Sequence, residues 1–151
     1  LTEVSMIHEN VSKTDALRKA KEVLDIVKLP RIENLLKKYP HELSGGMRQR
    51  VMIGIALMCD PLFIIVDEPT TALDVTTQKE ILRIFNDLKK YKDITMALIS
   101  HDIAVISEVS ESILVMNEGK IVENGDCKKV LSSPNHEYTK HLLSCIPEWM
   151  K

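Results

Sequence analysis

The sequence has few cysteines, which could cross-link the chain or bind a metal ion through sulfur. Its 151 residues include three cysteines, Cys59, Cys127 and Cys145, which lie far apart and share no metal-ligand spacing. This odd number, without a disulfide framework, indicates a reducing compartment. Cys59 lies in an apolar run, so we expect its thiol to be in the core.

An excess of one charge and a long apolar run are also lacking. The net charge is −2, which gives no electrostatic reason to expect nucleic acid as a partner. The most apolar window, residues 51–66, is interrupted by Asp60-Pro61 and is shorter than the roughly 20 residues that span a bilayer. We interpret this window as a helix, a break and a buried strand. The hydrophobic fraction of 44% and charged fraction of 28% indicate a soluble globular domain.

Hydrophobic spacing predicts a parallel α/β architecture. Residues 14–27 are expected to form a helix that Thr14 caps and Leu29-Pro30 ends. Its buried face is expected to hold Leu17, Ala20, Val23 or Leu24, and Val27. The apolar run 62–67 is typical of a strand buried on both faces of a parallel sheet. The expected order of the other elements is helix 47–59, helix 75–92, strand 94–100, a short helix over 102–110, a hairpin around 117–119 and short helices at 126–133 and 136–146.

Glycine is scarce, yet two of the five glycines are adjacent, in Ser44-Gly45-Gly46. A helix that begins at about Met47 would have unpaired N–H groups and a positive dipole end. Glycines let a phosphate approach the backbone closely, and the Ser44 hydroxyl can cap the helix and bind the same ligand. The alternative is an ordinary serine N-cap with a flexible turn.

Two predicted strands end in residues that can carry chemistry. Ligands of parallel α/β sheets bind beyond the carboxyl ends of the strands, where Asp67-Glu68 and Ser100-His101-Asp102 stand. Asp67 is a candidate Mg²⁺ ligand, and Glu68 is a candidate to polarise an attacking water. The alternatives are two solvated acids in a loop and a structural histidine. Asp74 is expected to cap the helix 75–92.

Four stretches in one order resemble the ATP-binding subunit of ABC transporters. "LSGGMRQR" (43–50) resembles the signature loop, and "FIIVDEP" (63–69) resembles Walker B followed by the catalytic glutamate, Glu68. "ALD" (72–74) resembles the D-loop, and His101 matches the switch histidine. The resemblance implies a partial P-loop NTPase fold, with a helical signature subdomain and the Walker B half of a mostly parallel sheet. It also implies that Gln49-Arg50 support the loop rather than touch ATP.

The resemblance implies ATP and Mg²⁺ as cofactors and assigns roles to named residues. Asp67 would bind the metal, while Glu68 and His101 would act in hydrolysis. Asp74 would count among the cofactor-binding residues and would also meet a second ATP-binding subunit, homologous or identical. The other implied partners are transmembrane permease subunits and, indirectly, an extracellular or periplasmic solute-binding protein, at the cytoplasmic face of the membrane. Four residues would face ATP held by the second subunit: Ser44, Gly45, Gly46 and Met47.

The family's phosphate-binding Walker A pattern, G-x-x-x-x-G-K-[ST], does not occur in these 151 residues. No signal peptide is visible, and the chain begins with Leu1 rather than methionine. We therefore expect the C-terminal part of a nucleotide-binding domain, without ATPase activity by itself. We expect residues 1–60 to be the helical subdomain, 61–125 the Walker B part of the core and 126–151 a helical tail.

Details of the motifs resemble the oligopeptide and dipeptide importer group. They are the stretch "YPHELSGGMRQRVMIGIAL", the stretch "DEPTTALDVTTQ" and the tail "SPNHEYTKHLLSCIP", in which Glu137 replaces a common proline. A related importer of nickel or another small solute is one alternative. A soluble ABC ATPase of DNA repair or translation is another, although no long insertion is present. The third is a truncated piece that only packs against partners.

Overall fold

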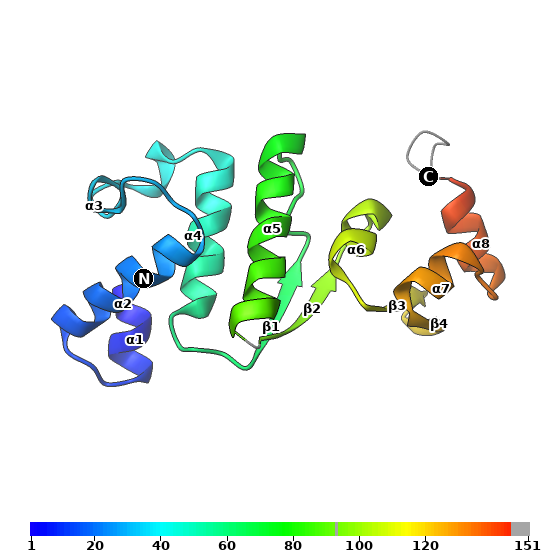
Figure 1. Cartoon of the computed structure of the whole chain (residues 1–151), viewed down its shortest axis with the longest axis horizontal. Coiled ribbons are helices and arrows are strands. Elements are labelled where there is room, and N and C mark those ends of the chain that lie inside the picture. Colours follow the sequence, from blue (N-terminus) through cyan, green and yellow to red (C-terminus); the bar gives the residue numbers. More distant parts are fainter. Residues whose placement is uncertain (93, 146–151) are drawn as a thin grey trace. The chain divides into compact units, whose positions relative to one another are not determined.

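The structure is a computed structural model that describes residues 1–92 and 94–145. These residues fall into two compact units, one within Leu1–Ile99 and one within Ser100–Lys151, and Figure 1 labels their helices and strands. The first unit contains the helices α1 (Thr2–His8), α2 (Lys13–Ile26), α3 (Ile32–Leu35), η1 (Pro40–Glu42), α4 (Gly45–Leu57) and α5 (Val75–Lys92), and the strands β1 (Phe63–Asp67) and β2 (Thr95–Ile99). The second contains α6 (Ile103–Val109), β3 (Ser112–Asn117), β4 (Lys120–Asp126), α7 (Cys127–Ser132) and α8 (Glu137–Ser144).

Helix α2 begins one residue earlier than the sequence indicated, and one residue of its expected buried face, Leu17, is exposed. The Ser12 hydroxyl accepts a hydrogen bond from the Asp15 N–H, so Ser12 is the N-cap and the assignment to Thr14 was wrong. Leu17 is 39% exposed, whereas Ala16 is fully buried. Leu17 and Ala16 are neighbours at the edge of the expected buried face, and the smaller side chain, Ala16, is the one that packs in the core. The expected burial of Ala20 and Val27 is confirmed, and of the two alternatives, Val23 and Leu24, both are buried.

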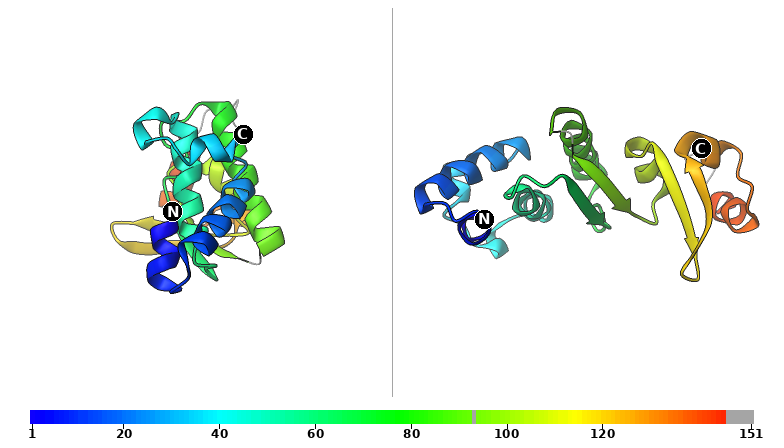
Figure 2. Two further views of the ribbon diagram at one scale, coloured as in Figure 1. Left: turned by 90° about the vertical axis from the view of Figure 1, so that its left-hand side faces the viewer. Right: turned by 90° about the horizontal axis from the view of Figure 1, so that it is seen from below.

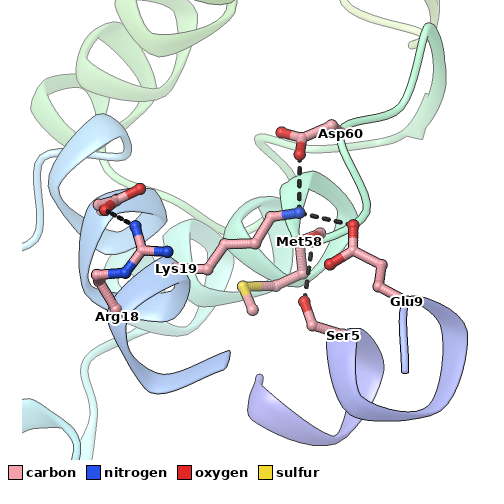
Figure 3. A network of polar contacts seen from close by, with 7 residues as sticks. Ser5, Glu9, Arg18, Lys19, Met58 and Asp60 are labelled. Carbon is pink, nitrogen blue, oxygen red and sulfur yellow. Dashed lines mark hydrogen bonds and ion pairs between the residues drawn. The ribbon is translucent and has the colours of Figure 1, made fainter. Parts of the chain in front are cut away.

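Polar contacts fasten α1 and α2 to the turn after α4 (Figure 3). The Lys19 ammonium lies 2.6 Å from a Glu9 carboxylate oxygen and 2.7 Å from one of Asp60. Burial would lower the pKa of Lys19, but its hydrogen bonds to Asp60 and Glu9 outweigh this and raise it. The buried Ser5 hydroxyl donates to the Met58 carbonyl oxygen at 3.1 Å. The Ser5 contact thus joins α1 to the end of α4, more than fifty residues along the chain.

The break within the apolar window 51–66 is confirmed. Helix α4 ends at Leu57, the chain turns at Asp60 with a φ of 43°, and β1 follows from Phe63. Cys59 lies in this turn and is exposed, so the expected core thiol was wrong. The buried cysteine is Cys127 in the second unit, where burial raises the pKa of its thiol.

Strands β1 and β2 are parallel, as the sequence predicted, with Phe63 opposite Thr95 and Asp67 opposite Ile99 (Figure 2). The expectation that β1 is buried on both faces was wrong. Phe63 and Ile65 are 53% and 65% exposed, while Val66 is buried. Alternate side chains point to opposite faces of a strand, so one face of β1 packs inward and the other is open in the described structure. The predicted helix 75–92 is present as α5, and its apolar stripe of Ile81, Ile84, Phe85 and Leu88 is buried.

The predicted hairpin in the second unit is confirmed. Strands β3 and β4 are antiparallel, and Glu118 and Gly119 between them have φ values of 49° and 75°. Two successive residues in the left-handed region give the turn that best fits the twist of paired strands. The predicted short helices are present as α6, α7 and α8, whereas the end of the last one, at residue 146, lies outside the described residues.

A buried carboxylate ties the hairpin to the segment before α8. Glu123 of β4 is 9% exposed and accepts hydrogen bonds from the Asn135 N–H at 2.7 Å and the His136 N–H at 3.1 Å. These bonds, the Asn135 N–H foremost, lower the pKa of Glu123 to about 2. His136 also caps α8, because its Nδ1 accepts from the Tyr138 N–H. Among the described residues, no helix combines the length and apolarity needed to cross a bilayer.

Candidate functional site

The glycine pair lies inside the first turn of α4 rather than in a loop before it. The Met47 N–H donates to the Ser44 hydroxyl at 3.3 Å, which confirms Ser44 as the N-cap. The helix begins at Gly45, so the expected start near Met47 was two residues late. Ser44 and Gly45 are exposed. This 13-residue helix therefore presents its capped, positive end at the surface of the first unit.

The start of α5 supports the start of α4, and the two helices pack side by side (Figure 1). A Cβ atom at Gly45 would lie 3.6 Å from Leu73 Cδ2, and one at Gly46 would overlap Thr77 Cγ2. The stretch around "SGG" therefore contacts the stretch "ALDVTT", thirty residues along the chain. Nothing in the spacing of either stretch predicted this contact, because it depends on tertiary packing.

Asp74 caps α5, as the sequence predicted. Its carboxylate accepts hydrogen bonds from the Thr77 N–H at 3.0 Å and the Thr77 hydroxyl at 2.7 Å. The hydroxyl bond is the larger cause, and together they lower the pKa of Asp74. Asp74 is thus ionised and held in place at the end of α5 that contacts the glycines.

The carboxylates Asp67 and Glu68 stand where β1 ends, and the backbone at Glu68 is strained. Glu68 has a φ of 46°, in the left-handed region that non-glycine residues rarely adopt. Its N–H donates to the Ile99 carbonyl oxygen at 2.9 Å, which continues the pairing of β1 with β2. The Thr71 hydroxyl donates to Glu68 Oε2 at 3.0 Å. The conformation is thus fixed from both sides, and such strain concentrates at functional sites.

The donor set fits Mg²⁺ only if a ligand supplies further oxygens. In residues 1–92 and 94–145 no three His, Cys, Asp or Glu side chains gather as a metal site. Mg²⁺ is usually bound by one or two carboxylates with water and substrate phosphates. Asp67 is exposed at the strand end and suits that role. The fit is therefore to a metal shared with a phosphate ligand.

His101 is exposed and lies in the short connection between β2 and α6. The next residue, Asp102, caps α6 by accepting from the Ala104 N–H at 2.9 Å, and its own N–H donates to the Ser100 hydroxyl. The connection around His101 is thus locally fixed. Since Glu68 and His101 belong to different units, their joint action stays a prediction.

Arg50 joins α4 to the end of α2 and to α5, while the supporting role expected of Gln49-Arg50 stays a prediction. Its side chain is 12% exposed, donates to the Lys28 carbonyl oxygen at 2.8 Å and pairs with Glu80 of α5. These groups border a pocket of about 410 Å³ beside the start of α4. The pocket is lined by Lys28, Leu29, Pro30, Ser44, Gly46, Met47, Arg50, Thr77 and Glu80.

Comparisons with known proteins agree with this arrangement. A family model described as ABC transporter matches residues 1–71. The oligopeptide transport ATP-binding protein AppD of Bacillus subtilis (strain 168) is 47% identical over 147 residues, 97% of this chain and 45% of AppD. The glutathione import ATP-binding protein GsiA of Escherichia coli (strain K12) is 44% identical over 148 residues, 98% of this chain and 24% of GsiA.

Solved structures share the fold. The dimeric ATP-binding cassette MJ0796, in a post-hydrolysis state bound to ADP and Pi, has a TM-score of 0.67 and 30% identity to this chain. The match covers 78% of this chain and 49% of that one. This chain thus spans about a quarter of GsiA and less than half of AppD.

Proposed function

The chain belongs to the ABC transporter family, as part of its ATP-binding domain, and on this premise we propose that it works in an importer subunit that couples ATP hydrolysis to peptide uptake. The observation that carries the proposal is the identity to AppD and GsiA along nearly the whole chain. Their names, an oligopeptide transport protein and a glutathione import protein, support peptide-like cargo over nickel.

We assign the first turn of α4 to ATP held by a second subunit. The Ser44 hydroxyl and the N–H groups of Gly45, Gly46 and Met47 stand at the positive end of the helix, where a phosphate is favoured. In the dimeric MJ0796 cassette, two copies associate. Asp74, at the adjoining end of α5, would meet that second subunit.

The end of β1 would supply the hydrolytic groups. Bound Mg²⁺ would neutralise phosphate charge, and Asp67 would hold it. Glu68 would accept a hydrogen bond from the attacking water and orient it, since its backbone is fixed by Ile99 and Thr71. His101 would add a hydrogen bond to the same phosphate.

The proposal extends to partners and place. The subunit would act at the cytoplasmic face of the membrane with transmembrane permease subunits, and a solute-binding protein would deliver the peptide. Residues 1–60 would be its helical subdomain, 61–125 the Walker B part and 126–151 the tail. The isolated chain would be inactive.

The test is a chimera in which this chain replaces the matched 147 residues of AppD. The chimera should hydrolyse ATP, and Glu68→Gln should lower turnover by on the order of a hundredfold or more while ATP binding is kept. ATP hydrolysis by the Glu68→Gln chimera at the unaltered rate would contradict the role of Glu68.

Glu118→Gln is the matched control. Glu118 is also a glutamate in the left-handed region, with a φ of 49°, but it lies in the exposed hairpin turn. Its substitution should leave turnover unchanged. If both variants lose activity equally, the loss reflects the backbone conformation rather than a role in hydrolysis.

A further inference from the structure

The backbone conformation of Gly46 is one that any residue can adopt, so it does not explain why this residue is glycine. It lies inside α4, and its φ is outside the left-handed region. Glycine costs helix stability relative to alanine, so a glycine in the first turn needs another reason. Close approach of a phosphate is one such reason, and the structure shows a second.

The second reason is that a methyl group of α5, that of Thr77, lies against Gly46 and leaves no room for a side chain there. A Cβ atom at Gly46 would overlap Thr77 Cγ2, whereas its distances to Thr77 Cβ and Oγ1 would both be 3.6 Å, an ordinary contact. Removing that methyl group alone would therefore make room for an alanine at 46.

The methyl group is held in place. The hydroxyl of Thr77 donates to one oxygen of Asp74 at 2.7 Å, and its N–H donates to the other at 3.0 Å. A β-branched side chain whose hydroxyl is bound has one staggered position left for its methyl group. The contact with Gly46 is thus set by the cap of α5.

We propose that Thr77 is a positioning residue: its methyl group sets how closely the start of α4 approaches α5, and thereby places Ser44 and the first N–H groups of α4. Leu73 also lies close to this turn, since its Cδ2 would be 3.6 Å from a Cβ atom at Gly45. The stretches 44–47 and 72–77 then form one rigid support. The consequence for ATP rests on the proposed function, but the contact itself does not.

The first test uses the chain itself and asks whether Gly46→Ala raises or lowers its stability. Without the Thr77 contact, Gly46→Ala would strengthen α4, because alanine is the better helix former. With the contact, Gly46→Ala should lower the urea midpoint of unfolding. The amide exchange rate of Arg48, whose N–H donates to the Ser44 carbonyl oxygen, should rise about tenfold.

Second substitutions at Thr77 identify the responsible atom. Thr77→Ser removes the methyl group and keeps both bonds to Asp74, so Gly46→Ala/Thr77→Ser should recover the original midpoint and exchange rate. Thr77→Val keeps the methyl group and loses the hydroxyl, so Gly46→Ala/Thr77→Val should stay defective. A stabilising Gly46→Ala, or equal behaviour of the two double variants, would overturn the proposal.

The second test measures KM and kcat for ATP in the AppD chimera. Thr77→Ser, which keeps Gly46 and removes only the methyl group, should raise KM or lower kcat, because the start of α4 is then no longer held at its distance from α5. If Thr77→Ser leaves both constants unaltered, the methyl group does not place the start of α4 and the positioning role is wrong. If the unaltered chimera hydrolyses no ATP, the proposed function fails, and the stability and exchange series decides the Thr77 contact.

Discussion

Arg50 Nη1 donates a hydrogen bond of 2.8 Å to the carbonyl oxygen of Lys28, where the chain leaves α2. The same guanidinium pairs with Glu80 of α5. One mostly buried side chain of α4 therefore joins three helices, and it does so one turn beyond the glycine pair. The planar fork of arginine suits this task, because it presents several donors at fixed angles.

Arg50→Met should lower the free energy of unfolding by about 1–3 kcal/mol, because it leaves the Lys28 carbonyl oxygen and Glu80 without their donor. Arg50→Lys should recover only part of the loss, since an ammonium cannot reproduce the fork. Urea unfolding followed by circular dichroism measures both. Arg18→Met is the control: Arg18 is 68% exposed, and losing its pair with Glu22 should change the value by less than about 0.5 kcal/mol. Equal effects at the two arginines would contradict the bridging role of Arg50.

Comparing substitutions of Ser44 and Ser12 separates the effect of losing a helix cap from the effect of losing a nucleotide contact. Each hydroxyl accepts one hydrogen bond, at 3.3 Å from the Met47 N–H and at 3.2 Å from the Asp15 N–H. Ser44→Ala and Ser12→Ala should each lower the free energy of unfolding of the chain by about 1 kcal/mol.

In the AppD chimera only Ser44→Ala should also weaken ATP-driven dimerisation, measured by sedimentation with ATP in the Glu68→Gln background. If Ser12→Ala weakens dimerisation as much, Ser44 is a helix cap and nothing more.

Glu123 makes the stability of the second unit depend on acid pH. Its pKa is about 2 in the folded chain, against an ordinary value of 4.5. Between these values the unfolded chain binds the proton and the folded chain does not, so this contribution is complete above about pH 4.5 and is lost as the pH falls towards 2. Urea midpoints between pH 6 and pH 2 should therefore fall less steeply for Glu123→Gln than for the unaltered chain.

Glu118→Gln removes a carboxylate from the same hairpin without touching the bonds to Asn135 and His136. This variant should keep the original pH dependence. A Glu123→Gln curve that runs parallel to the unaltered one would show that Glu123 is not the group responsible.

The chain as printed should bind ATP weakly. Its 151 residues contain no G-x-x-x-x-G-K-[ST] loop, which supplies most phosphate contacts in this family. Calorimetric titration with Mg-ATP should show no heat of binding at micromolar concentrations, with the AppD chimera as the positive control. A micromolar dissociation constant would mean that the chain holds ATP by other residues.

Local patterns predicted the parts of the fold that local physics decides. The helix 75–92 has an apolar stripe of four large residues, and burial of all four follows from its period. The hairpin was predicted from Asn117-Glu118-Gly119 between two short apolar runs, a pattern typical of a hairpin turn. Ser44 and Asp74 were found as caps because serine and aspartate have that preference before a helix.

Features that depend on neighbours distant in sequence were missed. An apolar run such as 62–67 does not reveal how many of its faces are covered, so the exposure of Phe63 and Ile65 could not be predicted. The choice of Ala16 over Leu17 depends on which side of α2 is packed. The Thr77 methyl group gave no signal, because a threonine in the first turn of a helix is unremarkable until Gly46 is seen beside it.

The exposed side chains of Phe63 and Ile65 should make the chain self-associate as its concentration rises. In the described residues β1 pairs with β2 alone, and the open face of β1 presents these two large apolar side chains to water. Such a surface attracts the same surface of another molecule, and an extended strand offers backbone groups for further pairing. Light scattering should therefore increase more steeply than protein concentration, and Ile65→Thr, which keeps the β-branch on the same strand face, should suppress the excess.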